Sequence, residues 1–116
     1  MFNFEKLEVW QKSIAFGALV YRATRSCTST EQFGLSSQIP RAATSVSSNI
    51  AEGSARPRQD FARFLGYAAG SVFEVISQAT VARNEGFLTD IGYRELYSAG
   101  EEISRMLSGL RSSLGE

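Results

Sequence analysis

Hydrophobic residues recur at three- and four-residue spacing along most of this chain, in four stretches separated by short polar segments. This period is typical of an α-helix with one buried face. The first stretch runs from about Glu5 to Arg25, with Asn3 as the expected N-cap. We predict that its core stripe consists of Leu7, Trp10, Ile14, Ala18 and Tyr21. Three apolar residues lie off that stripe and predict a second buried surface: Val9, Phe16 and Val20.

The second stretch begins at about Glu31 or Leu35 and ends at Glu52, because Gly53 is a natural helix stop. Pro40 removes one backbone donor, so it predicts either a kink or the true start of this helix. The expected core stripe of this stretch is Leu35, Ile39, Ala42 or Ala43, Val46 and Ile50.

The third stretch runs from about Gln59 to Asn84 and is closed by Gly86 as the C′ residue. The fourth begins with Thr89 as its N-cap and continues to the end of the chain. No period-two pattern of a strand competes with these helices. Four helices of about 20 residues with short connections predict an all-α fold, an antiparallel up-down-up-down four-helix bundle. We expect residues 1–116 to form a single domain.

The charges of the chain cancel overall but are unevenly spread. The formal net charge is zero, which argues against a surface that is basic throughout, as in a dedicated nucleic-acid binder. Residues 1–63 carry eight Lys or Arg against five Asp or Glu, and residues 64–116 carry four against seven. Ten of the twelve basic residues are arginine, which favours fixed ion pairs. Two interpretations follow, salt bridging within and between subunits or a local basic patch.

The cysteine content and the distribution of apolar residues predict the cellular compartment of the protein. Its single cysteine, Cys27, excludes an intrachain disulfide and indicates a reducing compartment. The first twelve residues are charged where a signal peptide would be apolar, and no apolar stretch approaches the length of a membrane span. We therefore expect a cytoplasmic protein that has no membrane partner.

No set of residues forms a recognisable active site. The chain has no histidine, so a Cys–His or Ser–His nucleophile and the Glu-x-x-His ligands of a di-iron bundle are excluded. One isolated cysteine does not make a structural zinc site, and no glycine-rich phosphate loop is present. We expect no enzymatic activity, no catalytic residues, no metal and no cofactor.

Polar residues on two of the apolar helices form a candidate network. Glu74 lies between Phe73 and Val75, so we expect it to be partly buried and paired with Arg41. The network predicts either a structural role that fixes helix register or a groove for a ligand or nucleic acid. Its members are Gln38, Arg41, Asn49, Glu52, Ser71 and Glu74.

The densest basic cluster lies where the second helix leads into the third. Arg56 and Arg58 flank Pro57, and Arg63 follows one turn into the third helix. Arg41 is a further candidate member. Such a cluster is able to hold phosphates, and the alternative is an ordinary solvated group of charges. The candidate nucleic-acid-binding residues are therefore Arg41, Arg56, Arg58 and Arg63.

Two long segments carry a family resemblance. Residues 33–53 read FGLSSQIPRAATSVSSNIAEG, residues 64–74 read FLGYAAGSVFE, and residues 7–12 read LEVWQK. These segments resemble the bacterial four-helix-bundle family named after the 23S ribosomal RNA intervening sequence, for which the NIAEG string looks like the hallmark. The resemblance implies an antiparallel bundle that assembles into a ring-like homopentamer. It assigns no chemical role to the polar motif residues.

Two functions therefore compete at the level of sequence. The first is a non-enzymatic, oligomeric four-helix bundle that binds RNA or another nucleic acid. The alternative is a protein-interaction or scaffold module with no nucleic-acid binding. The expected partners are other copies of the chain and, for the first function, RNA.

Overall fold

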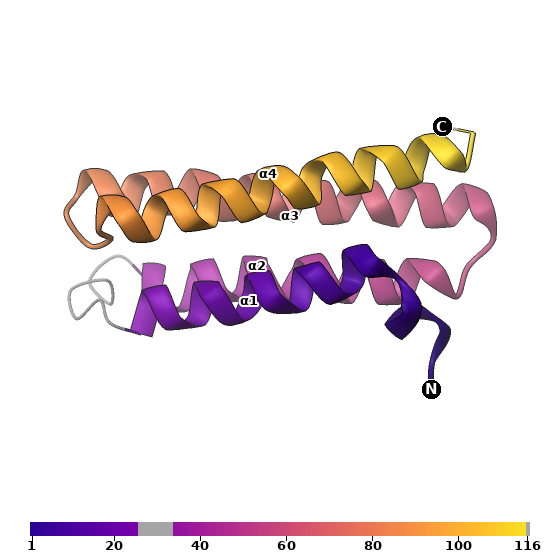
Figure 1. Cartoon of the computed structure of the whole chain (residues 1–116), viewed down its shortest axis with the longest axis horizontal. Coiled ribbons are helices and arrows are strands. Elements are labelled where there is room, and N and C mark those ends of the chain that lie inside the picture. The colour runs from indigo at the N-terminus through magenta and orange to yellow at the C-terminus, as the bar shows by residue number, and fades with distance from the viewer. Residues whose placement is uncertain (26–33, 116) are drawn as a thin grey trace.

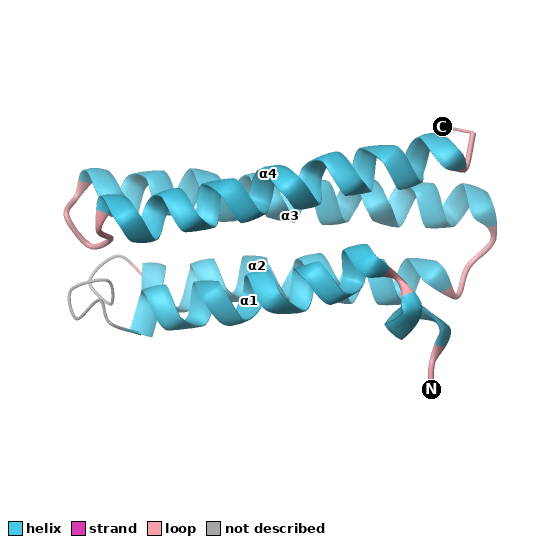
Figure 2. Ribbon diagram, in the orientation of Figure 1, coloured by secondary structure: helices cyan, strands magenta, loops and turns pink. Residues whose placement is uncertain are grey.

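The computed structural model describes residues 1–25 and 34–115, and the regular structure in these residues is helical (Figure 2). A short 3-10 helix, η1 (Asn3–Lys6), precedes four α-helices: α1 (Glu8–Arg25), α2 (Leu35–Ser54), α3 (Arg58–Asn84) and α4 (Asp90–Ser113). The predicted all-α fold with four helices is confirmed. Cys27 and the alternative helix start at Glu31 lie outside the described residues.

Neighbouring helices run in opposite directions along a bundle about 43 Å long (Figure 1). Each helix contacts the next one along the chain, and α4 closes the bundle against α1. Residues 55–57 and 85–89 connect α2 to α3 and α3 to α4, and such short connections place consecutive helices side by side. Both chain termini lie at the end of the bundle that holds the α2–α3 turn (Figure 1).

The interior is a continuous cluster of apolar side chains from all four α-helices. On α2 the predicted stripe is the buried one, with Ile39, Val46 and Ile50 fully enclosed. On α3 and α4, the buried residues also recur at helical spacing, including Val72 and Leu96. The predicted core face of α2 is therefore confirmed.

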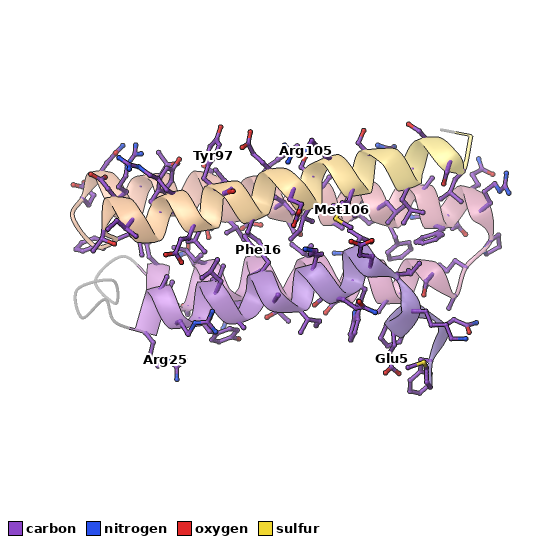
Figure 3. The ribbon with its side chains drawn as sticks, in the orientation of Figure 1. Glu5, Phe16, Arg25, Tyr97, Arg105 and Met106 are labelled. Atoms are coloured by element: carbon purple, nitrogen blue, oxygen red, sulfur yellow. The ribbon has the colours of Figure 1, made fainter. Side chains whose placement is uncertain are left out.

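The core face of α1 is the surface predicted as its second one, and of the predicted core stripe Leu7 and Trp10 pack against the core only in part. Val9 and Val20 are buried. Phe16 is only 1% exposed and points into the bundle (Figure 3). In contrast, Ile14 and Tyr21 of the predicted stripe are 47% and 51% exposed. The prediction was wrong because both apolar stripes of this helix satisfy the helical period, and the period does not say which stripe faces inward.

Two buried hydroxyl groups interrupt the hydrophobic pattern on the core face of α1, so this face was not recognised from the sequence. Ser13 and Thr24 lie on the inward side between the apolar residues. Each donates a hydrogen bond to a carbonyl oxygen of its own helix, Ser13 to Trp10 at 2.7 Å and Thr24 to Val20 at 2.9 Å. A hydroxyl satisfied in this way is tolerated in a core, so polar residues interrupt the buried stripe without opening it to water.

The start of the first helix also differs from the prediction. Asn3 is not an N-cap but the first residue of η1. Leu7 has an extended backbone (φ −76°, ψ 122°) and separates η1 from α1. Glu5 nevertheless acts at a helix start, because its carboxylate accepts a hydrogen bond from the backbone N–H of Phe2 at 2.9 Å.

The end of α3 and the start of α4 agree with the sequence, but the predicted helix stop at Gly53 is wrong. The helix α2 runs through Gly53 to Ser54, and this glycine instead allows close packing against Phe64 of α3. Thr89 caps α4, with its hydroxyl accepting a hydrogen bond from the N–H of Gly92 at 3.0 Å. Gly86 follows α3 with a φ of +81°, the left-handed conformation that a C′ glycine provides without steric cost. The helix α2 begins at Leu35 and continues through Pro40.

Candidate functional site: an arginine–aromatic cluster at one end of the bundle

Two arginines and two aromatic residues pack together where α2 turns into α3; we call Arg56, Arg63, Phe64 and Tyr67 the arginine–aromatic cluster. The guanidinium carbons of Arg56 and Arg63 lie 4.8 and 5.3 Å from the centre of the Phe64 ring. Phe64 meets the Tyr67 ring edge-on at 5.5 Å. These distances are typical of cation–π and aromatic contacts, which hold the flexible arginine side chains over a defined surface.

Helix geometry produces the cluster. Residues at positions i, i+3 and i+4 share a helix face, so the first two turns of α3 bring Arg63 and Tyr67 together with Asp60. Arg63 donates hydrogen bonds to Asp60 at 3.1 Å and to the Tyr67 hydroxyl at 3.3 Å. Arg56 forms an ion pair of 3.2 Å with Glu52 one turn earlier.

The local electrostatics keep Arg63 charged. The hydrogen bond to Tyr67, followed by the one to Asp60, raises the pKa of Arg63 above its ordinary value. A guanidinium has five N–H donors, and these two contacts occupy only some of them. Arg63 therefore presents a fixed positive charge with free donors to the solvent.

The other two arginines predicted to bind nucleic acid, Arg58 and Arg41, are not part of the arginine–aromatic cluster. Arg58 is exposed as the first residue of α3 and is close to the cluster in sequence. Arg41 is exposed on α2, fifteen residues before Arg56. A helical rise of 1.5 Å per residue separates these two positions by about 22 Å. The structure thus keeps Arg41 apart from Arg56, Arg58 and Arg63.

The predicted polar network is divided into separate groups. Asn49 donates hydrogen bonds to the backbone carbonyl of Ser45 at 2.8 Å and to its hydroxyl at 3.0 Å. The Ser71 hydroxyl donates to the same Ser45 oxygen at 2.9 Å and so joins α3 to α2. Part of the network therefore fixes the register of these two helices.

A second polar group lies toward the other end of the α2–α3 contact. The amide nitrogen of Gln78 donates to the side-chain oxygens of Gln38 at 3.4 Å and Glu74 at 3.3 Å. Sequence reasoning missed both bridging residues, Ser45 and Gln78. A usable signal existed for Ser45, since it precedes Asn49 by four residues on the same helix face.

The expected buried ion pair between Glu74 and Arg41 is wrong. Both side chains are exposed, and Glu74 is held by Gln78 rather than by Arg41. The physical reason is the rotation of α3, which buries Val72 and Val75 and leaves the two residues between them facing solvent.

Glu74→Ala is accordingly expected to change the free energy of unfolding by less than about 0.5 kcal/mol, the usual range for a surface substitution. Urea denaturation of the variant and the parent chain gives this difference directly. A loss of several kcal/mol would show that the carboxylate is buried against a positive charge after all.

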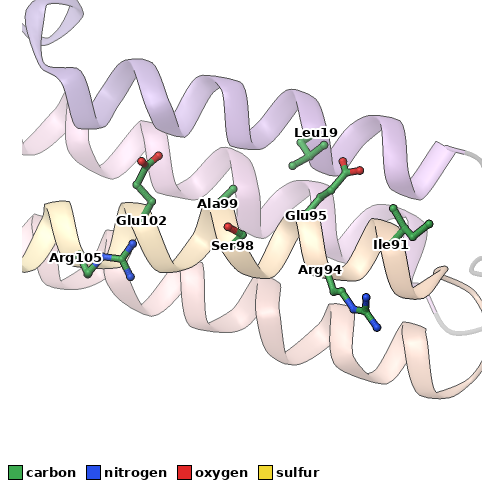
Figure 4. A pocket seen from close by; sticks show the side chains of 8 residues that line it. All are labelled: Leu19, Ile91, Arg94, Glu95, Ser98, Ala99, Glu102 and Arg105. Carbon is green, nitrogen blue, oxygen red and sulfur yellow. The ribbon is translucent and has the colours of Figure 1, made fainter.

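Grooves also line the sides of the bundle. One of them, with a volume of about 660 Å³, lies along α4 where that helix faces α1 (Figure 4). Its rim alternates in charge, with Arg94 and Arg105 beside Glu95 and Glu102. Lys12 of α1 pairs with Glu102 at 3.4 Å. Because opposite charges lie close together along it, this groove has no strong preference for an anion.

Two further observations concern the described part of the chain. In residues 1–25 and 34–115, no three acidic, cysteine or histidine side chains lie close enough together to hold a metal ion. None of the helices described is both long and apolar enough to cross a membrane.

Comparison with known proteins relates this structure to a family. A crystal structure from Bacteroides thetaiotaomicron, of a protein with unknown function from the S23 ribosomal protein family, superposes with a TM-score of 0.81. The two sequences are 24% identical, and the match covers 89% of this chain and 97% of the other. This likeness shows a shared fold. A search of the curated proteins finds no match.

A family model describes almost the whole chain. The model named 23S rRNA-intervening sequence protein matches residues 5–109, which include all of α1, α2 and α3 and most of α4. Neither this description nor that of the Bacteroides protein names an enzymatic activity. The chain belongs to the 23S rRNA-intervening sequence protein family.

Proposed function

We propose that this protein is a non-enzymatic four-helix bundle that binds RNA at the end carrying the arginine–aromatic cluster. The observation that supports this most strongly is the cation–π packing of Arg56 and Arg63 on Phe64, with Arg58 beside them. Guanidinium groups provide bidentate contacts to phosphate, and exposed rings provide surfaces for bases. The family name, which refers to ribosomal RNA, is consistent with RNA as the nucleic acid.

The acidic neighbours offset only part of the positive charge at this end. Two carboxylates stand against three arginines there, whereas the rim of the groove along α4 has two arginines and two glutamates. Glu52 and Asp60 pair with Arg56 and Arg63 on the surface. Exposed ion pairs of this kind are weak, because water and salt screen them. A phosphate is therefore able to replace a carboxylate as the partner of each arginine at little cost.

The proposal is tested by removing the charges together. Replacing Arg56, Arg58 and Arg63 with glutamine is expected to weaken binding of a labelled single-stranded RNA by about tenfold or more at low salt, because three phosphate contacts are lost. Fluorescence anisotropy titration measures the effect. Circular dichroism of the variant checks that the bundle remains folded.

A matched variant controls for net charge. Arg22, Arg94 and Arg105 are also exposed, but lie on α1 and α4 outside the cluster. Their replacement with glutamine changes the charge by the same amount and is expected to weaken binding by less than twofold. Equal losses in both triple variants would contradict a localised site, and no binding by the parent chain would contradict RNA binding itself.

Self-association is the second part of the proposal. Apolar side chains remain exposed on two sides of the subunit, including Ile14 and Tyr21 of α1, Phe73 of α3 and Tyr97 of α4. Surfaces of this kind on a small domain favour contact with other copies. Light scattering is expected to give the mass of about five chains, as the family resemblance implies, and a monomer would contradict it.

A protein-interaction role is the alternative, favoured by a separate feature. Phe73, Ile76 and Tyr97 line an apolar groove of about 340 Å³ between α3 and α4. The test is to isolate the protein after nuclease treatment and to identify any protein bound to it. If a defined protein partner is retained and the parent chain binds no RNA, a scaffold function replaces the proposed RNA binding.

A further inference from the structure

A second groove extends the arginine–aromatic cluster onto α4. It has a volume of about 400 Å³ and lies between the first turns of α3 and the last turn of α4. Arg63 and Tyr67 form part of its α3 side, and Arg111 reaches it from α4. The antiparallel packing of these helices thus brings a residue near the end of the chain to the cluster.

Arg111 lies beside Gly66 of α3. A Cβ atom at Gly66 would be in ordinary van der Waals contact with the guanidinium carbon of Arg111, at 3.6 Å, so the guanidinium group lies next to α3 at this position. Arg111 makes no ion pair with any acidic side chain in the described part of the chain. Arg63, which is paired with Asp60, and Arg111, which has no ion pair in the described residues, therefore both line this groove.

The aromatic part of the groove indicates which nucleic acid fits. Tyr67 is 48% exposed and lines the groove beside Arg63. In an RNA duplex the bases are stacked on one another and are not available to a tyrosine ring. In a single strand the bases are free to stack on aromatic side chains, while basic residues follow the phosphates.

We propose that this groove binds single-stranded RNA, with one phosphate between Arg63 and Arg111 and an adjacent base stacked on Tyr67. This inference rests on the proposed RNA-binding function and adds to it the strandedness of the ligand and a contact from α4. Substitutions of Arg111 and Tyr67 test this inference separately from the proposed function, because the proposed function is tested at positions 56, 58 and 63.

The test compares two single variants with matched controls in anisotropy titrations of a labelled oligouridylate. Arg111→Gln is expected to weaken binding several-fold and to reduce the slope of log K against log salt by about 0.7, because one phosphate contact is lost. Tyr67→Leu is expected to weaken binding about tenfold with little change in this slope, because it removes stacking rather than charge.

The controls are an arginine and a tyrosine of α4 that lie outside this groove. Arg94→Gln and Tyr97→Leu change the same residue types at exposed positions and are expected to alter binding by less than twofold. An RNA duplex of the same length is expected to bind at least tenfold more weakly than the single strand.

The outcomes separate this inference from the function on which it rests. If the parent chain binds no RNA, both fail. If the triple variant at positions 56, 58 and 63 loses binding while Arg111→Gln and Tyr67→Leu behave like their controls, RNA binding stands and the groove is not the site. Equal binding of duplex and single strand would overturn the stacking contact.

Discussion

Replacing Phe16 with alanine is expected to lower the free energy of unfolding by about 4 kcal/mol. Phe16 is among the largest fully enclosed side chains in the bundle, and its ring belongs to the core shared by all four α-helices. Truncation removes its burial and leaves a cavity that close-packed neighbours fill only in part. Urea denaturation at low micromolar concentration, followed by circular dichroism, measures the loss.

Tyr21→Ala is the matched control for Phe16. It removes an aromatic ring from the same helix, but from the outward face, where Tyr21 is 51% exposed. We expect a loss of at most about 1 kcal/mol in dilute solution. A Tyr21 loss that grows with protein concentration would report self-association through this face. If Tyr21→Ala cost more than Phe16→Ala in dilute solution, the rotation of α1 described above would be wrong.

Gly53→Ala is expected to destabilise the bundle by about 2 kcal/mol, although alanine is the better helix former. A Cβ atom at this position would lie 2.5 Å from the Cβ of Phe64 and 3.1 Å from the ring of Phe61. A Cβ cannot move away without the backbone, so α2 and α3 would have to separate. Overpacking of this kind costs roughly 1–3 kcal/mol, which exceeds the gain in helix propensity.

Gly70→Ala is the control for Gly53→Ala, because it gains the helix propensity of alanine without a steric clash. Gly70 lies within α3, and nothing is found within 4 Å of the position that its Cβ would occupy. This variant is expected to gain about 0.5–1 kcal/mol in the same denaturation experiment. If Gly53→Ala were also stabilising, α2 and α3 would not approach each other closely at the start of the turn.

These contacts give a structural meaning to the NIAEG string on which the family resemblance depends. Asn49 binds Ser45, Ile50 is fully buried, and Gly53 lies against Phe64. Glu52 is exposed and pairs with Arg56. Within this string, Gly53 therefore allows the close approach of α2 to α3, Ile50 fills the core, and Glu52 pairs with an arginine of the candidate site.

The fold was predictable from sequence because local signals agreed with one another. Helical spacing identified the buried face of α2, and Gly86 and Thr89 marked the end of α3 and the start of α4 as capping rules predict. The helix α1 was the exception, because it has two apolar stripes. Only the tertiary structure shows that the stripe containing Phe16 is the inward one.

The candidate site was predictable only where its residues are close in sequence. Arg56, Arg58 and Arg63 were recognised as a group, since a short turn and one helical turn connect them. Arg111 was missed because the antiparallel packing of α3 and α4 brings it to the groove from far along the chain. Arg41 was included wrongly, because its position fifteen residues before Arg56 places the two about 22 Å apart along the helix.

The salt dependence of RNA binding tests the central claim, a phosphate-binding surface at the arginine–aromatic end, most directly. Anisotropy titrations of the parent chain with a labelled single-stranded RNA are carried out over a series of salt concentrations. Contacts from the three arginines at positions 56, 58 and 63 predict a slope of log K against log salt of about −2, which the further contact from Arg111 brings to about −3, since each phosphate contact on a single strand contributes roughly −0.7. A slope near zero, or no binding at the lowest salt concentration, would contradict the account.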